Sequence, residues 1–337
     1  MSILSPIRWG ILGTGRIARK FIEALDETDS GVAVATGSRS QESAGQFKSE
    51  YPEVRCHGSY AGLLDDAEID AVYLATPHPF HLEWATAALR RKLPVLCEKP
   101  LTMNLAEAEE MIATARANDC ALAEAFRYRF HPQTHRVCEL VRSGVIGKVH
   151  QLHASFSHAA PFDPASRLFD AKLGASAILD VGCYPMSMVR LIAGAAHGTG
   201  FENPLIIQGM VETLSGAPDV DLKAIANLRF ADGLLAQIRC GMAAADRNAL
   251  EIDGTDGRIC VALPWSCSPP NQPAQIQIIR NGAIEPVDVV SPLSAMALEA
   301  AEFARMVKSG LLETPCMPWD DSLGNMAAMD VWRAATC

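Results

Sequence analysis

Residues 7–18 of this chain read IRWGILGTGRIA, an apolar run that ends in a glycine-rich turn. The first six of them predict a buried β-strand, and residues 16–27 predict a helix directly after the turn. Gly13 permits a tight turn, Gly15 lets a ligand approach the backbone, and the small Ala18 allows the helix to pack on the strand. Unpaired N–H groups at the start of such a helix bind phosphate. The stretch therefore predicts a dinucleotide site, with a purely structural tight turn as the alternative.

The same alternation of short apolar runs and amphipathic stretches continues to about residue 125. Strands that are apolar on both faces and separated by helices are typical of a parallel sheet covered on both sides. This context favours the dinucleotide interpretation, and we expect a Rossmann domain over residues 1–125. The expected strands are 32–36, 70–75, 94–97 and 121–124, and the expected helices are 42–50, 61–64, 81–91 and 104–118.

After about residue 147 polar and apolar residues alternate, which predicts an antiparallel meander with one solvent-facing side. We expect a second α/β domain over residues 126–337, with the C-terminal helix as a candidate to pack back on the Rossmann domain. The expected strands are 148–158, 204–214, 222–240 with a turn at 231–233, 249–253, 258–263, 275–280 and 285–290, and the expected helices are 175–193, 295–309 and 320–335.

The formal net charge is −10, from 29 basic and 39 acidic residues. An acidic surface repels phosphate backbones, so we expect neither nucleic acid nor an anionic membrane as a partner. The N-terminus shows no signal-peptide pattern and no apolar stretch reaches about 20 residues, so a cytoplasmic protein is expected. The ten cysteines include no C-x-x-C pair and the histidines are dispersed, which favours free thiols and no metal site.

The end of the second expected strand bears on the choice between NAD and NADP. NAD-binding proteins usually place an acidic residue there for the ribose 2′-hydroxyl. This chain instead has Ser38, Arg39 and Ser40, with no carboxylate before Glu42. These side chains can donate hydrogen bonds to a 2′-phosphate, so NADP is favoured and NAD remains the alternative. A solvated role for Arg39 is the competing interpretation.

Two places in the sequence offer groups for proton transfer. Lys99 follows an apolar strand, at the sheet edge where ligands bind in open α/β folds. A surface ion pair of Glu98 with Lys99 is the alternative, although adjacent residues of an extended chain point in opposite directions. Asp180 and Tyr184 are four apart in an expected helix and share a face. A nearby lysine cation would favour the phenolate, and an ordinary buried Asp–Tyr pair is equally compatible with the spacing.

Four ordered motifs make the chain resemble the glucose–fructose oxidoreductase / inositol dehydrogenase (Gfo/Idh/MocA) family. They cover about the first 195 residues, and the later half fits through its β-rich pattern. Many members carry histidine at the position of Tyr184. Because it has tyrosine there, the chain most resembles the dimeric dihydrodiol dehydrogenases and glucose–fructose oxidoreductase. The motifs are Gly13-Thr14-Gly15-Arg16-Ile17-Ala18, Ala75-Thr76-Pro77-His78-Pro79-Phe80-His81, Glu98-Lys99-Pro100 and Leu179-Asp180-Val181-Gly182-Cys183-Tyr184.

The resemblance implies a Rossmann domain followed by an α/β domain with a large open, mainly antiparallel sheet, whose face often forms a dimer interface. It also implies that Lys99 is catalytic with Pro100 commonly cis, that Tyr184 donates or accepts a proton, and that Asp180 holds substrate. Arg129 is implied beside the substrate, in a segment with Glu124 that lines the cleft. The implied cofactor contacts are Gly13, Thr14, Gly15, Arg16, Ile17, Ser38, Arg39, Ser40, Thr76, Pro77, His81, Glu98, Lys99 and Arg167.

Three departures from the family pattern affect the shape of the site: Ala175-Ser176 follows Gly174 in place of a glycine triplet, His78 replaces a common Asn, and Ser166 replaces a Trp. Substrate specificity is therefore the least transferable property. We expect an NADP-dependent oxidoreductase that interconverts alcohol and carbonyl on a sugar, polyol or trans-diol, and we expect it to form a homodimer or higher homo-oligomer. The alternatives are a non-catalytic NADP-binding sensor and a redox-assisted hydrolase with retained NAD.

Overall fold

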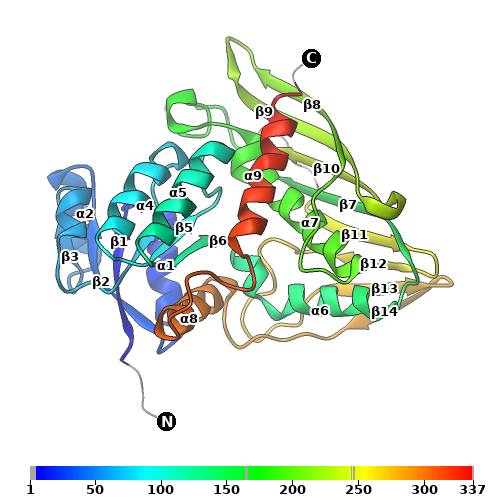
Figure 1. Cartoon of the computed structure of the whole chain (residues 1–337), viewed down its shortest axis with the longest axis horizontal. Helices are drawn as coiled ribbons and strands as arrows, with labels where there is room; N and C mark the ends of the chain where they lie inside the picture. The colour runs from blue at the N-terminus through cyan, green and yellow to red at the C-terminus, as the bar shows by residue number, and fades with distance from the viewer. Residues whose placement is uncertain (1–4, 164–165, 244, 246, 336–337) are drawn as a thin grey trace. The chain divides into compact units, whose positions relative to one another are not determined.

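A computed structural model describes residues 5–163, 166–243, 245 and 247–335 (Figure 1). The chain divides into two compact units. Unit 1 comprises residues 1–130 and 293–322, and unit 2 comprises residues 131–292 and 323–337. The first boundary between the units therefore lies after residue 130, whereas the sequence predicted a boundary after residue 125. Residues 293–322, which were expected in the second domain, belong to unit 1.

Unit 1 contains a six-stranded parallel sheet with the order β3-β2-β1-β4-β5-β6, which confirms the predicted Rossmann architecture. The order reverses between β1 and β4, and the carboxyl ends of these strands form the usual ligand-binding crevice. The strands are β1 (Ile7–Leu12), β2 (Gly31–Gly37), β3 (Arg55–His57), β4 (Ala71–Leu74), β5 (Val95–Glu98) and β6 (Leu122–Ala125). The helices are α1 (Arg16–Leu25), α2 (Gln41–Glu50), α3 (Tyr60–Leu64), η1 (His78–Phe80), α4 (His81–Arg90), α5 (Leu105–Ala117), η2 (Arg127–Phe130) and α8 (Ala295–Lys308).

Buried aromatic rings from the sheet and its helices form part of the core of unit 1. The rings of Phe21 and Tyr73 stack with centroids 3.8 Å apart, and Trp9 meets Phe21 edge to face at 5.1 Å. Helix α8 contributes Phe303, whose ring lies 5.3 Å from that of Trp9. This packing explains why α8, far along the chain, belongs to unit 1 with the Rossmann sheet.

Unit 2 is built on an eight-stranded sheet with the order β14-β13-β12-β11-β7-β10-β9-β8. In the described part of this sheet neighbouring strands pair antiparallel except β7 and β10, which pair parallel, so the predicted meander is mostly correct. The strands are β7 (Val149–Ser157), β8 (Ile206–Leu214), β9 (Ala217–Arg229), β10 (Leu235–Gly241), β11 (Ala249–Gly254), β12 (Arg258–Val261), β13 (Ile276–Arg280) and β14 (Ala283–Val287). The helices are α6 (Pro132–Arg142), η3 (Ala171–Leu173), η4 (Ile178–Gly182), α7 (Cys183–His197) and η5 (Ala231–Gly233), and α9 (Trp319–Arg333) begins in unit 1 and ends in unit 2.

One face of the sheet in unit 2 is buried and the other is exposed. Buried and exposed residues alternate along β9 and β10, as expected for strands with one wet side. Helix α7 contacts β7 and β10 on the buried face. The segment from Ala171 to His197 is long and apolar enough to cross a membrane. However, 94% of its most apolar 18-residue stretch is buried inside the protein, as in a core helix.

Two further features of unit 2 differ from the sequence prediction. Residues 178–182 form a π-helical turn where the sequence predicted an uninterrupted helix over 175–193. Such turns widen the helix and occur frequently at functional sites. Helix α6 was not predicted, although Pro132 at its first position and the N-cap His131 are helix-start signals; the His131 ring accepts from the Gln133 backbone N–H at 3.1 Å.

Candidate functional site

The glycine turn after β1 has the geometry that a bound dinucleotide requires. Gly13 has φ 119°, and a Cβ atom added there would lie 2.9 Å from the Ala75 carbonyl oxygen, so only glycine fits. A Cβ at Gly15 would meet nothing within 4 Å, which leaves the approach to the backbone open. Gly15 is also the N-cap of α1 and provides no capping side chain, so the first N–H groups of the helix are available to phosphate. The predicted turn thus fits a pyrophosphate.

Other predicted cofactor residues surround this turn within unit 1. Arg16 is exposed and Ile17 is half-buried in the first turn of α1. Thr14 is fixed through its carbonyl, which accepts a short hydrogen bond from the Arg19 guanidinium. Thr76 follows β4, and its buried hydroxyl finds no hydrogen-bond partner in the described protein. An orphaned hydroxyl at the strand-order reversal fits a polar ligand group there.

The end of β2 contains the residues predicted to select NADP. Arg39 is exposed, and Ser38 is 3% exposed with its backbone N–H bonded to the His57 carbonyl at 3.0 Å. The Ser40 hydroxyl caps α2 by accepting from the Ser43 N–H at 3.2 Å, so part of its hydrogen-bonding capacity is already used. The positive end of α2 and the guanidinium of Arg39 both favour an anion at this place.

The loop that carries Lys99 is held from several sides by side chains of unit 1. The His81 ring nitrogens lie 2.9 Å from the carbonyl oxygens of Pro100 and Thr76. The Glu124 carboxylate accepts the Leu101 N–H at 2.8 Å, and the peptide bond between Lys99 and Pro100 is cis, as the resemblance implied. The backbone that positions Lys99 is therefore fixed independently of the lysine side chain.

Burial changes the chemistry of the two groups that brace this loop. His81 is fully buried, which lowers its imidazole pKa, and both of its ring nitrogens face carbonyl oxygens. The ring therefore links the loop after β4 to the loop after β5, and the cofactor contact predicted for His81 stays a prediction. Burial raises the pKa of the Glu124 carboxyl to about 7. Sequence reasoning missed this bracing role because it depends on tertiary contacts.

Glu98 contacts its neighbours through its carboxylate. The Tyr73 hydroxyl donates to it at 2.5 Å, and the Lys99 backbone N–H donates to it at 3.2 Å. The carboxylate anchors the end of β5 just before the lysine.

Arg129 does not present a free charge to a ligand. Its guanidinium pairs with the Asp321 carboxylate at 2.9 Å, and both side chains are 1% exposed. Because a buried ion pair is costly to break, Arg129 has a structural role in unit 1. The substrate contact predicted for Arg129 stays a prediction.

In unit 2, Asp180 and Tyr184 lie on the helical segment that begins with the π turn. Both are buried, at 7% and 6% exposure. The Arg167 side chain is 44% exposed, and its guanidinium lies 3.3 Å from an Asp180 carboxylate oxygen. The predicted residues Asp180 and Arg167 are therefore brought together. The cofactor contact predicted for Arg167 remains a prediction.

Two aromatic side chains around Tyr184 were missed by sequence reasoning. The Phe156 ring meets the Tyr184 ring edge to face at 5.0 Å, and the Trp265 ring lies 6.0 Å from it. Trp265 belongs to a proline-rich loop, and alternation along β7 did not reveal where the Phe156 ring points. No sequence signal linked these distant segments to the tyrosine.

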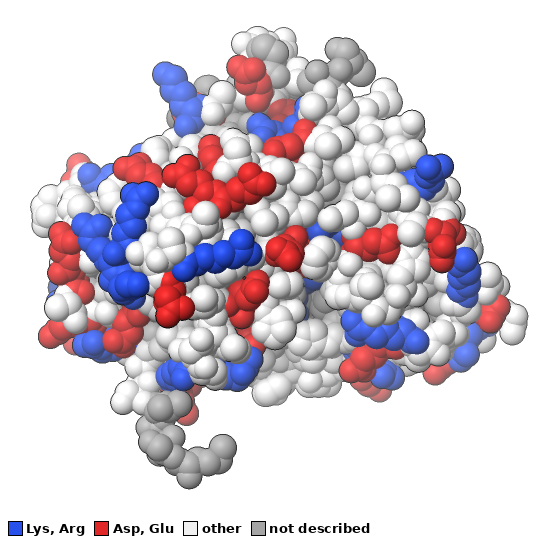
Figure 2. All heavy atoms as spheres, viewed as in Figure 1, with Lys and Arg blue, Asp and Glu red and all other residues white. Residues whose placement is uncertain are grey.

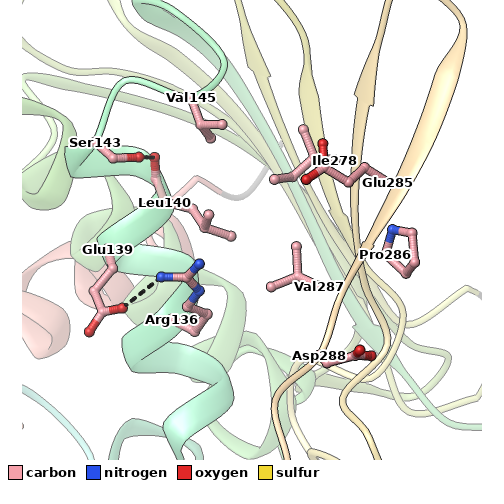
Figure 3. A pocket seen from close by; sticks show the side chains of 10 residues that line it. All are labelled: Arg136, Glu139, Leu140, Ser143, Val145, Ile278, Glu285, Pro286, Val287 and Asp288. Carbon is pink, nitrogen blue, oxygen red and sulfur yellow. Dashed lines mark hydrogen bonds and ion pairs between the residues drawn. The ribbon is translucent and has the colours of Figure 1, made fainter.

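A hollow lies elsewhere in unit 2, between α6 and the β13–β14 hairpin (Figure 3). Its volume is about 570 Å³, and it contains none of the predicted site residues. Arg136 and Glu139 form an ion pair on its helical side, and Glu285 and Asp288 add acidic groups on the opposite side. No group of three potential metal ligands occurs among the described residues, and the nine described cysteines are free thiols.

A Rossmann sheet with an open glycine turn, followed by a lysine at the end of β5, defines a nicotinamide-dinucleotide oxidoreductase. Two family models match the chain: "Oxidoreductase family, NAD-binding Rossmann fold" over residues 7–126 and "GFO/IDH/MocA C-terminal domain" over residues 134–260. The chain belongs to the Gfo/Idh/MocA oxidoreductase family. This confirms the predicted family, fold class and enzyme class.

Individual relatives match over almost the whole chain. The trans-1,2-dihydrobenzene-1,2-diol dehydrogenase of Danio rerio is 33% identical over 94% of this chain and 92% of its own length. The D-xylose 1-dehydrogenase (NADP(+)) 2 of Haloferax volcanii is 31% identical over 96% of this chain and 95% of its own length. The structure of KijD10, a 3-ketoreductase from Actinomadura kijaniata in complex with TDP-benzene and NADP, matches with a TM-score of 0.86 and 29% identity, covering 98% of both chains.

Proposed function

We propose that this protein is an NADP-dependent oxidoreductase that interconverts a secondary alcohol and a carbonyl on a sugar, polyol or trans-diol. The observation that carries the proposal is the braced Lys99 loop at the same edge of the Rossmann sheet as the open glycine turn. NADP stands in the names of the Haloferax enzyme and of the KijD10 complex. When bound, the nicotinamide exchanges a hydride with the substrate carbon.

The residues of the chain would handle the proton and the orientation of the substrate. Oxidation of an alcohol removes a hydride from carbon and a proton from the hydroxyl group. We assign the hydroxyl proton to the Tyr184 phenol oxygen, which accepts it in the ionised form, and we assign to the Lys99 ammonium a charge that favours ionisation of the reacting hydroxyl group. Asp180, beside Arg167, would accept a hydrogen bond from a neighbouring substrate hydroxyl. In the reductive direction the same phenol returns its proton to the carbonyl oxygen.

The named relatives support a substrate with two neighbouring oxygens. The Danio enzyme is named for a trans-1,2-diol and the Haloferax enzyme for D-xylose. A 3-reductase of Actinomadura kijaniata, 32% identical over 98% of this chain, is named for a 3,4-didehydro sugar nucleotide. A carboxylate such as Asp180 suits the second oxygen when it is a hydroxyl group. We therefore place a vicinal diol or α-hydroxy carbonyl first among candidate substrates.

A panel assay tests this proposal. NADP⁺ is supplied with D-xylose, trans-1,2-dihydrobenzene-1,2-diol or myo-inositol, and absorbance of the reduced nicotinamide is followed. Turnover of a vicinal-diol compound is the expected result. If none of these compounds is oxidised, and matching carbonyl compounds are not reduced by NADPH, the assigned substrate class is wrong.

The preference for NADP is tested at Arg39. Replacing Arg39 with alanine should weaken NADPH binding by about 10- to 100-fold, because a charge-assisted hydrogen bond to the 2′-phosphate is worth about 1.5–3 kcal/mol. NADH binding should change little, since NADH lacks this phosphate. Fluorescence titrations of both cofactors measure the difference. Arg90→Ala, at an exposed arginine in the last turn of α4, is the matched control. Equal loss of affinity for both cofactors would contradict the assignment.

We also propose that the protein forms a homodimer through the exposed sheet face of unit 2. This face presents large apolar side chains, including Met210 and Ile225, which pair across β8 and β9 and are 59% and 47% exposed. Monomeric proteins rarely expose contiguous apolar patches of this kind. Figure 2 shows acidic and basic side chains interspersed on the molecular face in view, and the net charge of −10 argues against nucleic acid as a partner. We keep a cytoplasmic location as part of the proposal.

The dimer is tested by placing charge on this face. Met210→Asp combined with Ile225→Asp should convert the dimer to a monomer, because four carboxylates would be buried in a symmetric interface. Analytical ultracentrifugation measures the mass of both forms. Val32→Asp, at a 47% exposed valine in β2, is the control and should leave the mass unchanged. A monomeric wild type would refute the proposed assembly.

A further inference from the structure

A tryptophan is buried in the long loop between β12 and β13 of unit 2. Trp265 is only 3% exposed, although loops normally lie on the surface. Its indole N–H donates to the Ser155 carbonyl of β7 at 2.8 Å, which satisfies its polar atom in the interior. The loop therefore places one large ring at a fixed point against the sheet.

The ring of Trp265 contacts the tyrosine to which we assign the proton. Its centroid lies 6.0 Å from that of Tyr184, with an interplanar angle of 64°. Trp265 is also stacked on Phe156 at 5.8 Å and 16°, and Phe156 meets Tyr184 edge to face at 5.0 Å and 80°. Two nearly parallel rings thus pack against one tyrosine ring, and a rotation of that ring would disturb both contacts.

A side chain from a distant helix anchors the loop. Gln133, in the first turn of α6 and 1% exposed, donates through its side-chain amide to the Leu263 carbonyl at 3.0 Å. The Cys267 N–H donates to the same carbonyl at 3.1 Å, which closes a compact turn around Trp265. Cys267 has φ 57°, a left-handed conformation that non-glycine residues rarely adopt. Tertiary contacts therefore hold this loop in one conformation.

We propose that Trp265, anchored by Gln133 and the Ser155 carbonyl, is a positioning residue that fixes the orientation of the Tyr184 phenol. The inference rests on the proposed function, because it assumes that this phenol carries the substrate proton. Trp265 acts only through the tyrosine: it sets the direction of the hydroxyl group and takes no part in proton transfer. A misplaced catalytic group costs about 100-fold in rate for a displacement of about 1 Å.

A double-mutant cycle tests the inference on the panel compound that is turned over best, with D-xylose and NADP⁺ as the first probe. Trp265→Leu should lower kcat by about 10- to 100-fold and change KM by less than about 3-fold. Trp265→Phe, which keeps an aromatic ring, should recover most of the loss. In the Tyr184→Phe background, Trp265→Leu should lower kcat by less than about 3-fold, because no phenol remains to be positioned.

The outcomes distinguish the proton-transfer role of Tyr184 from the positioning role of Trp265. If Tyr184→Phe retains the kcat of the wild type, the role proposed for Tyr184 is wrong. If Tyr184→Phe is impaired and Trp265→Leu costs the same factor in both backgrounds, the positioning role is overturned. Trp319→Phe is the matched control, since Trp319 is 5% exposed in unit 1 and its indole N–H donates to the Leu122 carbonyl at 2.9 Å. Its kcat should stay within about 2-fold of the wild type.

A spectroscopic readout needs no substrate and remains usable if Trp265→Leu does not fold. The chain has five tyrosines, so tyrosine labelled only at the ring carbon that carries the hydroxyl group gives five NMR signals, and Tyr184→Phe identifies one of them. Trp265→Phe and Gln133→Leu should each shift the Tyr184 signal and leave the other four in place. An unchanged Tyr184 signal in both variants would overturn the inference.

Discussion

Replacing Lys99 with methionine should lower kcat by about 100- to 10,000-fold and leave NADPH affinity within about 3-fold of the wild type. Methionine keeps most of the length of the side chain but removes the ammonium group to which we assign the charge that favours ionisation of the reacting hydroxyl group. The loop should keep its conformation, because the Leu101 N–H and the Pro100 carbonyl are held by Glu124 and His81. Steady-state kinetics and a fluorescence titration of NADPH measure the two effects separately.

Lys20→Met is the matched control for this variant. Lys20 is an exposed lysine of α1 in the same unit, and its replacement should change kcat by less than about 2-fold. A Lys99→Met enzyme with the rate of the wild type would remove Lys99 from the catalytic machinery. A non-catalytic NADP-binding sensor, the alternative from the sequence, would bind NADPH and turn over no panel compound even with Lys99 intact.

Replacing Gly13 with alanine is expected to have the largest effect on cofactor binding. The added methyl group would lie 2.9 Å from the Ala75 carbonyl oxygen, at φ 119°, so the turn must change shape. Strain of this kind costs about 1–3 kcal/mol, which corresponds to a loss of about 5- to 150-fold in NADPH affinity when the turn must be restored for binding. Isothermal titration calorimetry with NADPH measures the loss.

Gly45→Ala is the matched control, because it adds the same methyl group at a glycine where the group fits. Gly45 lies in α2 with open space around its Cβ position and an ordinary helical backbone. Alanine there should raise stability by about 0.5–1 kcal/mol and leave NADPH affinity unchanged. If Gly13→Ala bound NADPH as tightly as Gly45→Ala does, the turn would not hold the pyrophosphate.

The Rossmann half could be predicted from the sequence because its strands and helices have distinct hydrophobic periods. The strand before Gly13 and the strand before Lys99 were found within about one residue of their ends. The three residues of β3 escaped prediction because Arg55, Cys56 and His57 form no apolar run. The parallel pairing of β7 with β10 was also not predicted. The alternation of polar and apolar residues shows which face of a strand is exposed to solvent, but it does not show which strands are neighbours.

The candidate site could be predicted only in part, because sequence patterns do not show which distant segments contact one another. Spacing and resemblance pointed to Lys99, Asp180 and Tyr184, whose residue types carry the chemistry. The bracing role of His81 and the buried pairing of Arg129 depend on partners that are distant in the sequence. The ring of Trp265 beside Tyr184 comes from a loop whose prolines indicated only that it lies outside the sheet.

The central claim is that the chain transfers a hydride to freely exchanging NADP⁺, and a stoichiometry measurement tests it most directly. The purified protein is incubated with NADP⁺ and the panel compound that it turns over, and both the carbonyl product and NADPH are quantified. We predict one NADPH for each carbonyl formed. Product that accumulates without net formation of NADPH would contradict this account and would favour a redox-assisted hydrolase that retains its cofactor.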